Sequence, residues 1–228
     1  MSAWPSPTDY TTAIQNPQIC FRDADLKGAS VEKHRLTRMP KEWTGNFAQV
    51  YELRAGADRW AVKCFTRASE NLTARYTAIS SALAAAKLPY FVEFRFLADQ
   101  MLVNGKRYPI VKMQWLEGQP IDKFVEQNLF YPQVLLDLAA SLVKMVDTLE
   151  RQRLAHGDLQ HGNVVVTPSG LKLVDYDGMF VPSFTGMAAP EVGLPSFQHP
   201  KRGASDYAVG LDRFGPCRLR TLVWALVR

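Results

Sequence analysis

The stretch that decides the fold is His156-Gly157-Asp158-Leu159-Gln160-His161-Gly162-Asn163, followed by the apolar run Val164-Val165-Val166. A second strand-like run, Leu171-Lys172-Leu173-Val174, comes after the turn-forming residues Thr167-Pro168-Ser169-Gly170 and is followed by Asp175. This pattern predicts a polar loop that leads into a tight β-hairpin. Because loops held by a rigid scaffold carry most binding and catalytic groups, the gathering of Asp, Asn and His side chains here indicates a functional site.

The residues before this loop predict a long, buried helix over 133–153. Its apolar side chains recur at helical spacing along one stripe: Val134, Leu135, Leu138, Leu142, Met145, Val146 and Leu149. A stripe of this width is typical of a helix that packs into a core.

The first half of the chain predicts strands instead. Two are expected within 47–65, around the turn Ala55-Gly56-Ala57-Asp58, and two more around 91–97 and 108–115, around Asn104-Gly105. One helix is expected between the pairs, over 70–87, from the spacing of Leu72, Tyr76, Ile79 and Leu83. We therefore expect the α+β class, with a small antiparallel β-rich part before a mainly helical one.

Residues 1–42 are expected to form a leader that packs on the domain. Thr8-Asp9 is a candidate cap for a short helix through Ala13 and Ile14, and Pro17 is expected to stop that helix.

The composition is that of an ordinary globular protein. The chain has 228 residues, 47% of them hydrophobic and 21% charged, which is enough apolar material for a core. No apolar run approaches the roughly 18 residues of a membrane span, and no signal peptide is apparent. We expect a cytoplasmic protein without a membrane partner, whose isolated Cys20, Cys64 and Cys217 are reduced thiols.

The loop resembles the catalytic loop of the protein kinase superfamily, H-R-D-L-x-x-x-x-N, in which Asp and Asn are five residues apart, as Asp158 and Asn163 are. The resemblance implies that ATP and Mg²⁺ are cofactors, that Asp158 orients the attacking hydroxyl, and that Asn163 is a metal ligand. It also implies that Asp175 is the family's second metal ligand. Asp177 is a competing register, either as a further metal ligand or as a turn residue.

Further matches lie upstream, in the same order as in the family. Ala61-Val62-Lys63 resembles the V-A-I-K strand, which implies that Lys63 holds the α- and β-phosphates. Residues 45–50 resemble the second half of the glycine-rich loop, although Trp43 and Ala48 stand where two glycines would be. Met113 falls at the gatekeeper position and Leu116 at the hinge. The nucleotide-binding residues implied are Gly45, Phe47, Val50, Ala61, Lys63, Met113 and Leu116.

The chain also departs from the family pattern. Between Cys64 and Val92 the only acidic residue is Glu70, so either Glu70 reaches Lys63 or the family's Lys–Glu pair is missing. Gln160 replaces a lysine, and Gly157 replaces the arginine that pairs with a phosphorylated activation loop, so control by such phosphorylation is not expected. Asp212 resembles the aspartate that ties the catalytic loop in place.

The segment between the metal aspartate and Asp212 has two candidate motifs for its functional end. Ala189-Pro190-Glu191 is similar to the family's A-P-E, and Gln198-His199-Pro200 is the alternative. His199 is interpreted as a packed loop histidine without chemistry.

The resemblance covers about 43–214. It implies a bilobal fold, with a kinase-like N-lobe over 43–116, a partial C-lobe over 117–214 and an atypical basic tail over 215–228, as if the C-lobe were truncated. The implied function is transfer of the γ-phosphate of Mg-ATP to a protein Ser/Thr hydroxyl. Alternatives are a small-molecule kinase and a catalytically impaired pseudokinase that binds nucleotide as an interaction module.

A nucleic-acid partner is not expected. The net charge of +5 is small, and the idea rests only on the arginines of the tail, since no reading helix, stacking platform or zinc spacing supports it. The sequence does not indicate an oligomeric state.

Overall fold

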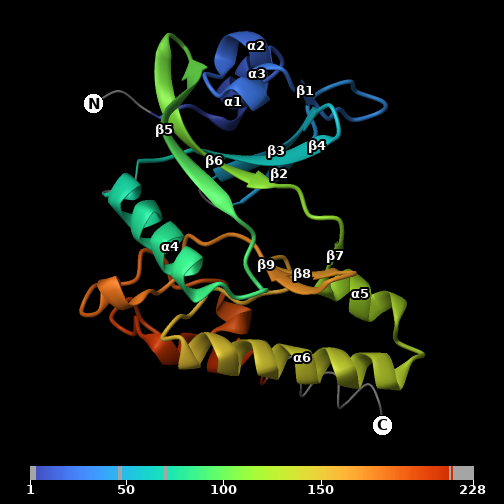
Figure 1. Cartoon of the computed structure of the whole chain (residues 1–228), viewed down its shortest axis with the longest axis vertical. Helices are drawn as coiled ribbons and strands as arrows, with labels where there is room; N and C mark the ends of the chain where they lie inside the picture. Colours follow the sequence, from blue (N-terminus) through green and yellow to red (C-terminus); the bar gives the residue numbers. More distant parts are fainter. Residues whose placement is uncertain (1–3, 46–47, 69–70, 216, 218–228) are drawn as a thin grey trace. The chain divides into compact units, whose positions relative to one another are not determined.

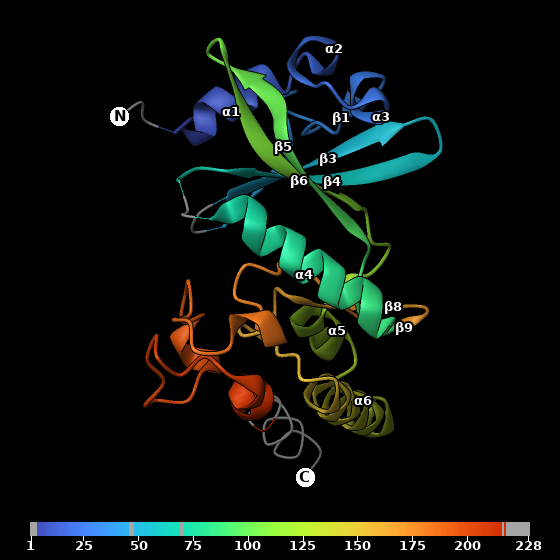
Figure 2. The same cartoon turned by 60° about the vertical axis from the view of Figure 1, so that its left-hand side comes forward.

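The computed structural model describes residues 4–45, 48–68, 71–215 and 217. The chain divides into two compact units, residues 1–80 with 93–115 (unit 1) and residues 81–92 with 116–228 (unit 2) (Figures 1 and 2). Unit 1 is built on an antiparallel sheet, whereas helices contribute the longest elements of unit 2. The predicted α+β class is therefore confirmed.

Unit 1 contains a sheet with the strand order β1-β3-β4-β6-β5, and β2 pairs with β3. Its strands are β1 (Ser30–Val31), β2 (Glu42–Thr44), β3 (Ala48–Ala55), β4 (Asp58–Phe65), β5 (Phe94–Val103) and β6 (Lys106–Gln114). Both predicted hairpins are present, β3–β4 around Gly56 and β5–β6 around Asn104-Gly105. The expected start of β5 near Phe91 is wrong, because Phe91 instead forms a bridge with Leu173 in unit 2.

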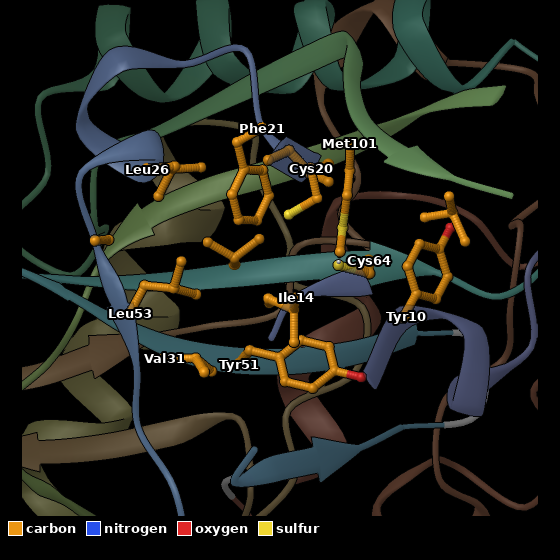
Figure 3. Packing of buried hydrophobic residues seen from close by; sticks show 14 residues of the cluster. Tyr10, Ile14, Cys20, Phe21, Leu26, Val31, Tyr51, Leu53, Cys64 and Met101 are labelled. Atoms are coloured by element: carbon orange, nitrogen blue, oxygen red, sulfur yellow. Dashed lines mark hydrogen bonds between the residues drawn. The ribbon is translucent and has the colours of Figure 1, made fainter. Parts of the chain in front are cut away.

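One face of this sheet is covered by the N-terminal segment. Helices α1 (Pro7–Ala13), α2 (Pro17–Cys20) and α3 (Ala24–Lys27) contribute side chains to a buried apolar cluster with the sheet. Figure 3 shows that side chains of these helices meet Tyr51, Leu53, Cys64 and Met101 from β3, β4 and β5. The segment is thus part of the core of unit 1.

The cap of the first helix differs from the expectation. Ser6 is the N-cap, and Asp9 is the third helical residue of a capping box in which each side chain accepts from the other's backbone N–H. Thr8 lies inside the helix, because Pro7 suits the first helical position, where its missing N–H costs nothing. The helix ends at Ala13, and Pro17 begins α2.

A buried ion pair also fastens this segment to the sheet. Lys112 on β6 is 2% exposed, and its Nζ lies 2.8 Å from Asp23 Oδ1 and 2.5 Å from Asp25 Oδ2. The same nitrogen lies 4.2 Å from the ring centre of Trp60. A buried ammonium is tolerated only when it is paired in this way.

The other sheet face packs against α4 (Leu72–Ala86), close to the predicted 70–87. The Tyr76 ring of α4 lies 5.6 Å from Phe65, 5.8 Å from Phe94 and 5.2 Å from Phe96, measured between ring centres. Aromatic contacts therefore set where this helix meets the sheet.

Unit 2 is organised around α6 (Pro132–Arg151), which matches the predicted helix and buries all of the predicted stripe except Val134. The other elements are β7 (Gln119–Pro120), α5 (Ile121–Gln127), β8 (Val164–Thr167), β9 (Gly170–Leu173), η1 (Pro182–Phe184), η2 (Pro195–Phe197) and η3 (Val209–Arg213). Strands β8 and β9 form the predicted hairpin, and β7 pairs with β8.

The three cysteines are free thiols, as the composition predicted. Among the described residues, no helix combines the length and the apolar character needed to cross a membrane. Of the predicted basic tail, only Gly215 and Cys217 lie within the described residues.

Candidate active site

The loop over 156–163 brings Asp158 and Asn163 together. The Asn163 amide nitrogen donates to the Asp158 carbonyl oxygen at 2.9 Å and to the Asp158 carboxylate oxygen Oδ2 at 3.1 Å. The Asn163 side chain is buried. Because the amide nitrogen is engaged by Asp158, the amide oxygen Oδ1 is the Asn163 atom with the chemistry of a magnesium ligand.

The hairpin then brings Asp175 to the same loop. Val164 pairs with Leu173, and the Val174 N–H donates to the Asn163 carbonyl at 3.1 Å, so Asp175 follows a residue bonded to Asn163. The His156 ring nitrogen Nε2 lies 2.9 Å from the Val174 carbonyl oxygen and holds the strand end from the other side. Asp175 has φ +65°, an uncommon backbone state for a residue with a side chain, and such states are found preferentially at functional sites.

Tyr176 fixes the backbone around this aspartate. Its hydroxyl donates to the Leu173 carbonyl at 2.8 Å and accepts from the Val92 N–H at 2.9 Å. Burial raises the pKa of Tyr176, so the hydroxyl remains a donor. Of the two neighbouring carboxylates, Asp175 is exposed and Asp177 is half-buried. Asp175 stays the predicted metal ligand.

The loop is anchored on a buried carboxylate. Asp212 is 4% exposed and accepts from the backbone N–H of His156 and, at 2.8 Å, of Gly157. Burial raises the pKa of Asp212, while the charge of His156, the two backbone hydrogen bonds and the charge of Arg202 oppose that rise. The geometry agrees with the anchoring role that the sequence resemblance implied.

A downstream segment also reaches the loop, through Gln198 of the predicted Gln198-His199-Pro200 motif and through Leu194 and Arg202, which the sequence does not mark. The Leu194 N–H donates to Asp158 Oδ1 at 2.9 Å, and Arg202 Nη1 donates to the Gly157 carbonyl at 2.6 Å. The Gln198 amide nitrogen lies 3.4 Å from the Gly157 carbonyl. Neither motif nor spacing marks Leu194 or Arg202, and the only available signal was the absence of an arginine at position 157. His199 packs against Phe214, with ring centres 5.5 Å apart.

The donor set limits how a metal could bind. Within the described ranges, no three side chains of His, Cys, Asp or Glu lie close enough to hold a metal ion by themselves. Magnesium commonly takes one or two protein oxygens and completes its shell with phosphate oxygens and water. The residues therefore fit magnesium as part of Mg-ATP, with the Asn163 amide and the Asp175 carboxylate as the candidate protein ligands.

In unit 1, the strand register gathers four predicted nucleotide-binding residues on one sheet face. Val50 is the Cα partner of Lys63, and Ala61 is the partner of Met113. Directly paired residues project to the same face, and alternate residues along a strand share it. These four therefore lie opposite the face that carries Tyr51, Val62 and Cys64 under the N-terminal helices.

The described residues on the two sides of the loop next to this face are paired with each other. The Gly45 N–H donates to the Ala48 carbonyl at 2.9 Å, and Val50 pairs with Trp43. The Trp43 ring lies 4.9 Å from the ring of Trp115, so an aromatic contact ties β2 to the residue after β6. The predicted nucleotide contact Phe47 and the proposed lysine partner Glu70 lie outside the described residues, and Leu116 is the first residue of unit 2 after β6.

The antiparallel sheet of unit 1 and the loop and hairpin that follow α6 in unit 2 are the elements of a protein-kinase-like fold. A crystal structure of the PknI kinase domain of M. tuberculosis superimposes with a TM-score of 0.56 at 16% sequence identity, covering 92% of this chain and 75% of that one. The chain thus has a protein-kinase-like fold.

A relative in Dictyostelium discoideum, described as the probable serine/threonine-protein kinase mkcD, is 23% identical over 243 residues. The match covers 96% of this chain and 36% of the relative, so the chain spans little more than a third of the relative's length. No protein-family model matches the chain.

Proposed function

We propose that this chain transfers the γ-phosphate of Mg-ATP to a hydroxyl group, with a protein Ser or Thr as the acceptor. The observation that carries the proposal is the bonded pair Asp158–Asn163 on a loop anchored by buried Asp212. Phosphoryl transfer needs little covalent chemistry from a protein, so catalysis depends on positioning and on charge stabilisation. A carboxylate held in a fixed orientation beside an amide ligand meets the first of these needs.

In the proposed reaction, Asp158 orients the acceptor hydroxyl and takes its proton as the oxygen bonds to the γ-phosphorus. The bond from the γ-phosphorus to the bridging oxygen breaks, and ADP leaves. Lys63 is assigned to the α- and β-phosphates, and Asn163 and Asp175 to magnesium, which would neutralise charge on the phosphates.

The nucleotide base is assigned to the face of unit 1 that carries Val50, Ala61 and Met113. Their shared face supports this assignment, because adenine needs an apolar surface beside the phosphate-binding lysine. Gly45, Phe47 and Leu116 complete the proposed set of nucleotide contacts.

A protein acceptor is supported by the Dictyostelium relative, whose description is that of a probable serine/threonine-protein kinase. The fold alone would also suit a small-molecule hydroxyl, since one fold hosts many substrates.

The proposal is tested by the melting temperature of the chain with and without Mg-ATP. At a nucleotide concentration a hundred times Kd, binding should stabilise the chain by about 2.7 kcal/mol, or roughly 5 to 10 °C at this size. Asp175→Ala should abolish the magnesium-dependent part, while Asp147→Ala, an exposed position on α6, should not. A cooperative transition that Mg-ATP does not shift would contradict the proposal.

One contact favours a second candidate, a nucleotide-binding module that does not transfer phosphate. The Leu194 N–H occupies Asp158 Oδ1 at 2.9 Å, an atom that an acceptor hydroxyl would need. Gly193 packs so closely that a Cβ there would lie 2.5 Å from the same oxygen.

Removal of the Leu194 N–H distinguishes the enzyme from the nucleotide-binding module. Leu194 has φ −71°, a value that proline adopts, so Leu194→Pro deletes the N–H, and because its ring Cδ stands where the hydrogen pointed it also displaces the Asp158 carboxylate from this contact. Leu194→Ala is the control that keeps the N–H. Transfer of labelled phosphate from ATP that is higher in Leu194→Pro than in Leu194→Ala supports the enzyme. Nucleotide binding without transfer in the wild type and both variants supports the module.

A further inference from the structure

Position 157 cannot hold a side chain in this loop. Gly157 has φ +80°, and a Cβ built there would lie 2.2 Å from the Gly178 carbonyl oxygen. Backbone in that position cannot move aside as the tip of a flexible side chain can. The arginine that the family resemblance would place at 157 is therefore excluded by the geometry of the loop itself.

The guanidinium of Arg202, which is distant in sequence, contacts the backbone carbonyl of Gly157. Arg202 Nη1 donates to the Gly157 carbonyl at 2.6 Å and also to the Gln198 side-chain oxygen. Gln198 is buried, and its amide nitrogen lies 3.5 Å from Asp158 Oδ1. Arg202 thus contacts the peptide that precedes Asp158, and a second side chain links it to the carboxylate.

The backbone that leads into Asp158 is held at three successive peptide units. Asp212 accepts from the N–H groups of His156 and Gly157, while Arg202 donates to the carbonyl of Gly157. The backbone on the N-terminal side of Asp158 therefore has its donors and its acceptor bound to charged side chains. Hydrogen bonds to charged groups are roughly twice as strong as neutral ones.

Stability alone does not explain the position of the Arg202 guanidinium. Its Nε and Nη2 atoms are buried and have no hydrogen-bond partner among the described residues. Burial lowers the pKa of Arg202, and Asp212, Asp158, Glu191 and Asp206 oppose the shift. Since unpaired buried donors are costly, an arginine kept in this position calls for a functional reason.

We infer that Arg202 is a positioning residue for the reaction proposed above: it holds the Gly157 carbonyl, and thereby orients Asp158, without a phosphorylated partner. The inference rests on the proposed function for its catalytic consequence, but the contact itself can be tested separately. Because the guanidinium comes from the same segment as Leu194 and Gln198, Arg202 also couples this segment to the catalytic loop.

The test compares Arg202→Met, Arg202→Lys and the control Lys201→Ala, whose side chain is exposed. With labelled ATP and water or the chain's own hydroxyls as acceptors, Arg202→Met should lower kcat about 10- to 100-fold, the scale of a misplacement of about 1 Å. KM for Mg-ATP should change less than about twofold, because nucleotide binding is assigned to other residues. Arg202→Lys should recover part of kcat, since an ammonium can also donate to the carbonyl.

Hydrogen exchange supplies a readout that does not need activity. In Arg202→Met, amides of 155–163 should exchange at least about tenfold faster, while those of α6 remain protected and report an intact fold. Wild-type kcat together with unchanged exchange would overturn the inference. So would a kcat loss accompanied by loss of α6 protection, because general unfolding lowers the fraction of active molecules.

The two proposals fail in different ways. If the wild type shows no Mg-ATP binding or no transfer, the proposed function fails, and exchange at 155–163 then decides alone whether Arg202 holds the loop. If the wild type transfers phosphate and Arg202→Met does so equally well, only the role of Arg202 is rejected.

Discussion

The sheet of unit 1 and the loop over 156–163 in unit 2 are held in different ways. Each long strand of the sheet pairs with its neighbour in sequence through a hairpin, β3 with β4 and β5 with β6. The loop is held by hydrogen bonds to residues that are distant in sequence. Leu194 bonds to Asp158, 36 positions earlier, and Arg202 and Asp212 bond to Gly157, 45 and 55 positions earlier. The sheet is therefore stabilised by many similar contacts, and the loop by a few buried polar ones.

This difference between the sheet and the loop predicts how much stability a single substitution should cost in each. A sheet held by many apolar contacts and backbone hydrogen bonds loses a little with each change, whereas a loop with few polar anchors loses much when one is removed. The expected effects below run from the largest to the smallest.

The largest effect is expected for Asp212→Ala. It leaves the buried N–H groups of His156 and Gly157 unpaired, at about 1 to 3 kcal/mol each, so the free energy of unfolding should fall by about 4 kcal/mol. Urea denaturation measures the loss, and Asp206→Ala, at an exposed site, is the control. A fall below about 1 kcal/mol would mean that the loop does not depend on Asp212.

Substitutions of two lysines on opposite faces of the unit 1 sheet should have different effects on stability and on nucleotide affinity. Lys112→Met leaves buried Asp23 without its partner and should cost about 3 kcal/mol of stability, with no change in nucleotide affinity. Lys63→Met should cost less stability than Lys112→Met but raise the Kd for Mg-ATP at least about tenfold, which is about 1.4 kcal/mol.

Titration calorimetry and urea denaturation of the same two samples check this pair. Equal loss of affinity in both variants would contradict the assignment of the two faces.

A pH effect is expected from the core beneath the N-terminal helices. Burial raises the pKa of the Cys20 thiol from 9.0 to about 12. Between these values the unfolded chain releases a proton that the folded chain keeps, so stability should fall as pH rises from 9, by about 1.4 kcal/mol per unit for this group.

Urea midpoints measured from pH 8 to 11 test this effect. Cys20→Ala should make the alkaline decline less steep, while buried Cys64, Tyr10 and Tyr51, whose pKa values burial also raises, keep part of it. Cys217→Ala, at an exposed site, should leave the decline unchanged. The same slope in wild type and Cys20→Ala would show that other groups cause the decline.

The smallest effect is expected at the surface of unit 2. Arg213 and Glu150 form an ion pair at 2.6 Å, but the arginine side chain is 72% exposed. Arg213→Ala should therefore cost about 0.5 kcal/mol or less. The contrast with Asp212, its neighbour in sequence, is measured in the same denaturation series, and a loss comparable to that of Asp212→Ala would contradict the account of the loop.

Much of the fold could be predicted from local pattern. Both hairpins, α4 and α6 follow from turn residues and from apolar spacing, which depend on neighbours in sequence. The errors lie at element ends: Ser6 rather than Thr8 or Asp9 is the N-cap, and β5 begins at Phe94. Ends depend on caps and long-range bridges such as Phe91–Leu173, which periodicity does not report.

Some residues of the candidate site could likewise be predicted from the sequence, and others could not. Asp158, Asn163 and Asp175 could be selected from their spacing around one loop and one hairpin, and the structure brings the three together in unit 2. The Leu194 and Arg202 contacts could not, because no residue spacing encodes which surface of a distant segment meets the loop.

The sequence by itself determined the strands, the two principal helices and the identity of the polar groups in the loop, since each depends on short-range periodicity and side-chain chemistry. Tertiary structure alone decided which side chains bind the backbone before Asp158: Asp212 accepts from the N–H groups of His156 and Gly157, and Arg202 donates to the Gly157 carbonyl. The physical reason is that burial turns ordinary polar residues into strong anchors, and burial belongs to the folded chain as a whole.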